Sequence, residues 1–322
     1  MFLQNLLTTA QQVFILYILI AVGFFADKFG LYTEKASKLN TNLLFYIVTP
    51  LVIVNSFLSI DNSPENLKNF GIAALLGVAI HVIGIVLVLV FPFFRKAENT
   101  KAGIYRYACI YGNCGYMALP LAQAVLGPQG TFYCSAVIMI FNIFSFTHGI
   151  YIIGAQKGGF DFKKLFINPC TIGVTIGLPL YLFGVELPTV IATPISSLAT
   201  LNTPLAMLIF GTYIAHTDLK TMFTDKYIYL VGIVKLIAVP LIMIGAFKLF
   251  NIPTELATAI AVSASAPCAN NTVIFAGKYN LDTGTASKTV ALVSFFSIIT
   301  MPVMIALAAT RPKGRQTNGN RE

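Results

Sequence analysis

The chain has 322 residues, of which 57% are hydrophobic and only 10% are charged, and its mean hydropathy is +0.79. Soluble domains do not have this composition, so the sequence indicates an all-α integral membrane protein. The formal net charge of +9 does not by itself point to nucleic acid, because membrane proteins carry a lysine and arginine bias in their cytoplasmic loops.

Apolar runs of about 20 residues, the length that a helix needs to cross the hydrocarbon core, recur along the chain. They lie at about 10–29, 39–59, 70–94, 105–126, 131–154, 169–185, 195–216, 227–249, 255–278 and 285–309. We therefore expect ten transmembrane helices, followed by a polar tail at 310–322. The first ten residues lack the basic segment of a secretory signal, so the first run is expected to remain as a helix.

Loop charges predict the orientation of the chain in the membrane. The loops after the first, third, fifth, seventh and ninth runs hold almost all of the lysines and arginines between runs, whereas the other loops hold only Lys68. The positive-inside rule then places the lysine-rich loops in the cytoplasm and both chain ends outside, for a multi-pass protein of the cell or inner membrane. The basic tail, RPKGRQTNGNRE, runs against this rule.

The sequence matches itself at an offset of 154 residues. The matches pair Phe29-Gly30 with Phe183-Gly184, Thr49-Pro50-Leu51 with Thr203-Pro204-Leu205, and Gly130-Thr131 with Gly284-Thr285. This register predicts two five-helix repeats, at 13–154 and 167–308. Because each repeat has an odd number of crossings, the second repeat starts on the opposite side of the membrane. Inverted repeats are typical of secondary transporters.

The fourth and ninth runs, one in each repeat, contain residues that interrupt a helix. The interrupting and flanking residues are Gly112, Asn113, Gly115, Pro267, Asn270 and Asn271. Irregular backbone at membrane depth is tolerated where it lines a wet cavity, and paired interruptions are typical of a transporter's binding site. The second half of each broken helix then starts inside the membrane with free N–H groups that attract an anion. We expect these six residues to hold a carboxylate, although the asparagines can also serve only as helix caps.

Ionisable residues inside the membrane are rare here. Every Asp and Glu lies in a loop, near a helix end or in the tail, which argues against the paired buried carboxylates of a sodium/proton antiporter. Two basic residues lie deep, His81 and Lys235, and they are 154 residues apart. Lys235 is expected either to attract a substrate anion or to extend toward the cytoplasm as an anchor. His81 is either a neutral imidazole bonded to a neighbouring helix or a proton carrier. The five cysteines lack the spacing of metal ligands, so no metal is expected.

The stretches YGNCGYMALPLAQAVLG, SASAPCANNTVIFAGKYN and ALVSFFSIITMPVMIAL resemble those of the auxin efflux carrier family, whose bacterial members include malate and malonate permeases. The resemblance covers essentially the whole chain. It implies a ten-helix fold like that of sodium/proton antiporters and bile-acid symporters, with helices 4 and 9 crossing at their breaks. It further implies a scaffold of helices 1, 2, 6 and 7, often dimeric, and a moving bundle of helices 3–5 and 8–10.

The sequence therefore predicts a secondary transporter that moves small organic anions, such as malate, malonate or auxin-like acids, by alternating access. Its expected partners are the anion, the lipid bilayer and a second copy of the chain, with no nucleic acid and no bound cofactor. Coupling to sodium, coupling to protons and uniport all remain open. The alternatives are a sodium-coupled carrier of larger amphipathic anions and a membrane sensor that binds an anion without moving it. An enzyme is not expected, because no nucleophile with a base and no phosphate loop is evident.

Overall fold

The computed structural model describes residues 2–154, 168–216 and 222–310. Within these ranges seven helical stretches are long and apolar enough to cross a membrane, and they are Ala10–Lys28, Glu34–Leu58, Pro64–Val90, Cys114–Ile152, Thr189–Ala215, Lys226–Leu249 and Thr283–Ala309. The prediction of an all-helical, multi-pass membrane protein is confirmed for the described chain. The count of ten helices and their inverted arrangement stay predictions, and the tail beyond Thr310 lies outside the described residues.

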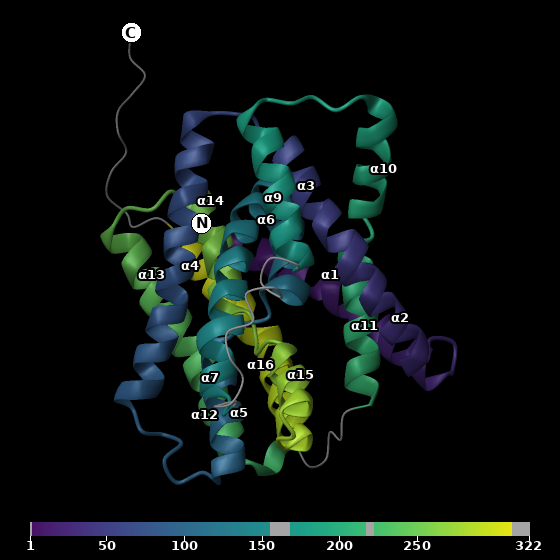
Figure 1. Ribbon diagram of the computed structural model, residues 1–322. Coiled ribbons are helices and arrows are strands. Elements are labelled where there is room, and N and C mark those ends of the chain that lie inside the picture. Colours follow the sequence, from purple (N-terminus) through teal and green to yellow (C-terminus); the bar gives the residue numbers. More distant parts are fainter. Residues whose placement is uncertain (1, 155–167, 217–221, 311–322) are drawn as a thin grey trace.

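The helices follow one another as a bundle (Figure 1). They are α1 (Phe2–Lys28), α2 (Glu34–Leu43), α3 (Thr49–Leu58), α4 (Pro64–Val90), α5 (Asn99–Ile110), α6 (Leu119–Phe144), α7 (Ile150–Ile152), α9 (Pro169–Leu182), α10 (Thr189–Ala199), α11 (Asn202–Ala215), α12 (Lys226–Ile233), α13 (Val239–Leu249), α14 (Thr254–Ser265), α15 (Asn271–Lys278) and α16 (Thr283–Ala309). In Figure 1, α13 and α10 lie at opposite edges, with α6 and α16 between them. Gly127, at a φ of 61°, bends α6 sharply.

Helix α4 begins six residues before the third apolar run of the sequence. Ser63 caps its first turn, because the Ser63 hydroxyl accepts a hydrogen bond from the Asn66 backbone N–H over 3.2 Å. Pro64 follows at a position where a missing N–H costs nothing. The helix ends at Val90, before the Phe91-Pro92 pair. Hydropathy alone misplaced this helix because its capped first turn is polar.

Wide π-helical turns precede three prolines. They are η1 (Leu44–Val48) before Pro50, η2 (Cys114–Ala118) before Pro120 and η5 (Val234–Ala238) before Pro240. A proline has no N–H for the carbonyl four residues earlier, and a wider turn changes the hydrogen-bond register locally. At η1 the Leu44 carbonyl accepts from the Thr49 backbone N–H and from the Thr49 hydroxyl, the latter over 2.8 Å. The threonine hydroxyl therefore stabilises the proline-containing helix.

Two glycines bring α1 and α11 into close contact. A Cβ at Gly23 would lie 2.3 Å from the Leu208 carbonyl oxygen, and a Cβ at Gly211 would lie 2.2 Å from the Ile20 carbonyl oxygen. Small residues allow such backbone approach between membrane helices. Lys28 adds a hydrogen bond of 2.8 Å to the carbonyl oxygen of Ala215, at the end of α11. The first helix and α11 therefore form one tightly packed pair.

Candidate functional site

Two helices of the bundle are broken. Helix α5 ends at Ile110, residues 111–113 leave the helix, and helical structure resumes in η2 at Cys114. Helix α14 ends at Ser265, and residues 266–270 separate it from α15. Ala266 has an extended ψ of 138°, as expected for a residue before proline. Both breaks lie at the glycine, asparagine and proline positions that the sequence singled out.

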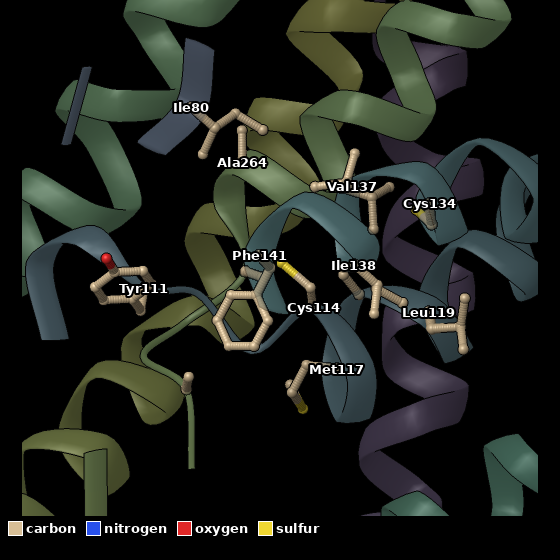
Figure 2. Close-up of a cluster of buried hydrophobic side chains, with 14 of the residues drawn as sticks. Ile80, Tyr111, Cys114, Met117, Leu119, Cys134, Val137, Ile138, Phe141 and Ala264 are labelled. Carbon is tan, nitrogen blue, oxygen red and sulfur yellow. The ribbon is translucent and has the colours of Figure 1, made fainter. Parts of the chain in front are cut away.

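The two breaks meet through their backbones. Gly112 and Cys268 form an antiparallel β-bridge, in which the Asn113 backbone N–H donates to the Pro267 carbonyl over 2.7 Å and the Ala269 N–H donates to the Tyr111 carbonyl over 3.0 Å. Backbone groups that the breaks release from the helices are thereby paired inside the protein, as burial requires. Figure 2 shows Cys114, Ile138 and Phe141 among the buried apolar side chains of this region.

Lys235 lies fully buried beside this crossing. Its ammonium donates to the carbonyl oxygen of Ala264, in the last turn of α14, over 3.4 Å. A Cβ at Gly112 would lie 2.8 Å from the Lys235 Nζ and 2.9 Å from its Cε, so the glycine leaves room for the lysine. The end of a helix carries partial negative charge, which a cation stabilises. The Lys235 side chain therefore ends inside the bundle, and the buried polar residues of the described chain include no Asp or Glu.

Asn113 caps the half-helix that follows it and still has an unused donor. Its Oδ1 accepts from the Tyr116 backbone N–H over 3.2 Å, whereas its buried Nδ2 has no hydrogen-bond partner in the structure. A buried donor without a partner costs free energy, about 1–3 kcal/mol, unless a bound molecule or water accepts from it. Asn113 therefore combines the capping role with a donor that is free for a ligand.

The asparagines of the second break differ from each other. Asn271, the first residue of α15, donates from Nδ2 to the Ser145 hydroxyl over 3.4 Å. Asn270 makes no side-chain cap, and its buried Oδ1 has no partner among the described atoms, which is also true of the neighbouring Thr272 hydroxyl. A Cβ at Gly115 would meet no atom within 4 Å. The crossing thus combines an unpaired amide donor at Asn113 with an unpaired amide oxygen at Asn270 and an unpaired hydroxyl at Thr272, which can donate or accept.

His81 packs against the first break without a polar path to it. Its Nδ1 lies 2.7 Å from the Gly77 carbonyl oxygen on its own helix, so this nitrogen carries the proton. Its ring stacks on Phe144 at 5.1 Å and lies 5.7 Å from the Tyr111 ring. The bond to its own helix, rather than to a neighbouring one, differs from the expectation for a neutral His81. Buried among rings, this histidine is poorly placed for a proton carrier.

A cavity of about 490 Å³ lies between α2, α11, α15 and α16. Asn270 lines it together with the aromatic side chains of Tyr116, Phe210 and Tyr213. Lys38 and Lys288 line it near the helix ends, where Lys38 pairs with Glu34 over 2.9 Å. Both lysines lie next to loops that the positive-inside rule places in the cytoplasm. The cavity therefore connects one of the predicted site residues with that face of the protein.

Sequence reasoning missed several residues of this region. Tyr116 and Lys288 line the cavity, and Tyr111 and Ser145 contact the breaks. The only sequence signal concerns Tyr111, which lies four residues after Tyr107 and therefore on the same face of the helix. In the described ranges no group of three or more His, Cys, Asp or Glu side chains is arranged to hold a metal ion.

Comparison with known proteins gives the chain its relatives. The model of a family described as membrane transport protein matches residues 8–162 and 157–305. An uncharacterized transporter of Methanocaldococcus jannaschii is 23% identical over 293 residues, which cover 89% of this chain and 94% of that protein. A protein of Rhizobium meliloti, provisionally named as a malonate transporter, is 24% identical over 226 residues, which cover 67% of this chain and 70% of that protein.

Proposed function

Because the chain belongs to the membrane transport protein family that includes the auxin efflux carriers, we propose that it is a secondary transporter of small organic anions that works by alternating access. The crossing of the two breaks carries this proposal. It combines the unpaired Asn113 amide with the buried ammonium of Lys235, and no buried carboxylate of the described chain competes for them. An amide donor and a cation together favour a carboxylate ligand, and both act more strongly in a medium of low dielectric constant.

Ten membrane helices in two inverted repeats are part of the proposal. The seven long spans become ten if α6 is divided at Gly127 and α9 is added. In this count α5 and the first part of α6 form one membrane span, and α14 and α15 form another. Equivalent boundaries recur at the sequence offset, since α1 ends at Lys28 and α9 at Leu182. Each of these helices is followed by a glycine with positive φ, Gly30 at 74° and Gly184 at 60°. These correspondences support an inverted repeat, the architecture on which many alternating-access carriers are built.

The cavity serves as the route to the crossing in this proposal. Lys288 attracts anions to this cavity, whereas the charge of Lys38 is balanced by Glu34, which also lines it. Asn270 lies on its wall and is the last residue of the break that pairs with Tyr111 and Asn113. The arrangement then corresponds to a carrier that is open toward the cytoplasm. The first, second, sixth and seventh membrane spans would form the scaffold; they consist of α1, α2 with α3, α9, and α10 with α11. A second copy of the chain is the proposed partner.

The substrate that we propose is a small carboxylate of the malonate type. The name of the Rhizobium meliloti relative supports this choice. A larger amphipathic anion is the second candidate, because aromatic and aliphatic side chains line much of a cavity of about 490 Å³. Sodium-dependent uptake of a bile acid, without uptake of malonate, would favour the second candidate.

Uptake of labelled malonate into proteoliposomes tests the function. We expect saturable uptake that other small carboxylates inhibit, and a loss of about tenfold or more in Asn113→Ser, which keeps a capping oxygen but removes the amide donor. Asn42→Ser, at an exposed asparagine of α2, is the matched control and should transport normally. Proton and sodium gradients, applied separately, identify the coupling ion. If malonate enters no faster than into empty liposomes while the protein remains folded, the proposed substrate is wrong.

A further inference from the structure

One helical turn contacts both breaks. It is the π-helical turn η3 (Ser145–Gly149), which follows α6. The Ser145 hydroxyl accepts from Asn271 Nδ2 over 3.4 Å and lies 2.7 Å from the Tyr107 hydroxyl. His148 Nδ1 lies 2.8 Å from the Tyr111 hydroxyl. Asn271 begins α15 and Tyr111 directly follows α5, so η3 connects the second break through serine and the first through histidine.

A glycine makes this contact close. An added Cβ at Gly149 would lie 2.8 Å from Cε2 of Tyr107 and 3.1 Å from Cζ of Tyr111. The two tyrosine rings stack on each other with centroids 4.4 Å apart. Without a side chain at position 149, both rings lie directly against η3. A displacement of this turn therefore displaces Tyr111, whose carbonyl belongs to the β-bridge.

The hydrogen bonds of Tyr111 depend on the protonation of His148. The Tyr111 hydroxyl has one hydrogen and two neighbours, the Phe144 carbonyl oxygen at 3.0 Å and His148 Nδ1 at 2.8 Å. If Nδ1 carries no proton, the hydroxyl can donate to only one of them. In protonated His148, Nδ1–H donates to Tyr111 and the tyrosine donates to Phe144. A neutral imidazole protonated at Nδ1 gives the same pattern, but the bond from imidazolium is charge-assisted and stronger.

His148 is more accessible to a proton than the other histidine near the first break. It is partly exposed, whereas His81 is fully buried. The titratable groups that face it are Tyr111 and, behind it, Tyr107, with His81 of α4 within electrostatic range. Near η3, α15 presents the neutral Asn271 and Phe275, and no carboxylate in the described chain interacts with His148.

We propose that His148 is a positioning residue that makes the arrangement of the crossing depend on pH. A proton taken up from water by its imidazole strengthens the bond to Tyr111 and favours the arrangement described above over its alternatives. Histidine is the side chain whose ordinary pKa lies closest to neutral pH, which suits it to a response of this kind. The link to transport rests on the proposed function, whereas the link between His148 and the crossing does not.

Two buried thiols at the crossing, Cys114 and Cys268, report on its arrangement without any substrate. Alkylation by N-ethylmaleimide, followed by mass spectrometry, is compared at the same pH in the full chain and in His148→Gln. We expect both thiols to react about tenfold more slowly in the unmodified chain at pH 5, and the rates to converge at pH 8. Tyr111→Phe should behave like His148→Gln. Asn42→Ser, at the exposed asparagine of α2 that lies outside the cavity lining, is the control and should keep the rate ratio of the unmodified chain.

Malonate uptake over pH 5–8 is the second measurement, and its profile should flatten in His148→Gln and in Tyr111→Phe. Equal alkylation rates at pH 5 in the unmodified chain and in both variants would overturn the inference. Absence of malonate uptake at every pH, with the expected alkylation ratios, would instead overturn the proposed substrate and leave the role of His148 supported.

Discussion

The ammonium of Lys235 donates to the carbonyl oxygen of Ala264 over 3.4 Å, inside the bundle and 29 residues away in sequence. Ala264 lies in the last turn of α14, where backbone carbonyls have no partner within the helix. The lysine therefore satisfies a helix end that the break leaves open. Whether it also holds substrate is a separate question, because a carbonyl takes only part of the bonding capacity of an ammonium group, which has three donors.

Lys235→Met separates these two roles. The substitution leaves the Ala264 carbonyl unpaired, at a cost of about 1–3 kcal/mol, and also removes a buried charge whose desolvation costs several kcal/mol. Because the two effects oppose each other, we expect the melting temperature to change little. We expect malonate uptake to fall by about tenfold or more, since the cation no longer attracts the anion. Normal uptake in a folded variant would restrict Lys235 to a structural role.

Gly112→Ala and Gly115→Ala form a matched pair within one segment. A Cβ at Gly112 would lie 2.8 Å from the Lys235 ammonium and 3.3 Å from the Ala266 carbonyl oxygen, whereas a Cβ at Gly115 would meet nothing within 4 Å. We expect Gly112→Ala to destabilise the protein by about 1–3 kcal/mol through overpacking. Gly115→Ala should be neutral or slightly stabilising, because alanine has the higher helix propensity. Thermal unfolding in detergent measures both, and equal melting temperatures would show that Lys235 moves aside without cost.

The Asp282 carboxylate, which lies outside the membrane-spanning segments, is expected to make part of the free energy of unfolding depend on acid pH. It caps α16, accepting from the Thr285 backbone N–H over 2.8 Å and from the Thr285 hydroxyl over 2.7 Å. These hydrogen bonds, the backbone one first, hold the pKa of the Asp282 carboxyl below its ordinary value. A lowered pKa in the folded state means that the contribution is present above the ordinary pKa of aspartate and is lost as the pH falls through the folded value.

Asp282→Asn tests this sign, because asparagine also caps helices but does not titrate. The unmodified chain should exceed the variant in melting temperature at pH 6, and the difference should shrink as the pH falls below about 4. Thermal unfolding of both proteins across this range measures the difference. A difference that is constant with pH would show that the carboxylate charge does not stabilise the cap.

The positions of the breaks could be predicted from the sequence, but their contacts could not. Glycine and proline act locally, so Gly112 and Pro267 indicate where a helix ends. The acceptor of Lys235 is not local. Its carbonyl lies on another helix, and hydropathy carries no information on which helices touch. The sequence therefore located the lysine at membrane depth while leaving its partner, and hence its role, undecided.

The interruptions of the helices near the Thr-Pro pairs were likewise predictable in position but not in form. The π-turn η1 directly precedes the Thr49-Pro50 pair. In the equivalent helix, α10 ends at Ala199 and α11 begins at Asn202, so a break precedes Pro204. Proline is tolerated in the first turn of a helix, and Pro204 lies in that turn of α11. In both helices the irregular stretch precedes the Thr-Pro pair, but the pair alone does not decide whether the helix widens into a π-turn or breaks.

The β-bridge between Gly112 and Cys268 joins the two broken helices at one point. An unpaired break would let each half-helix tilt independently, whereas the hydrogen bonds from Asn113 to Pro267 and from Ala269 to Tyr111 couple the two segments. A tilt of α5 is therefore expected to tilt α14 as well, and the reverse also holds. The four half-helices that meet at the bridge can then change orientation together while the backbone segments between them keep their hydrogen bonds.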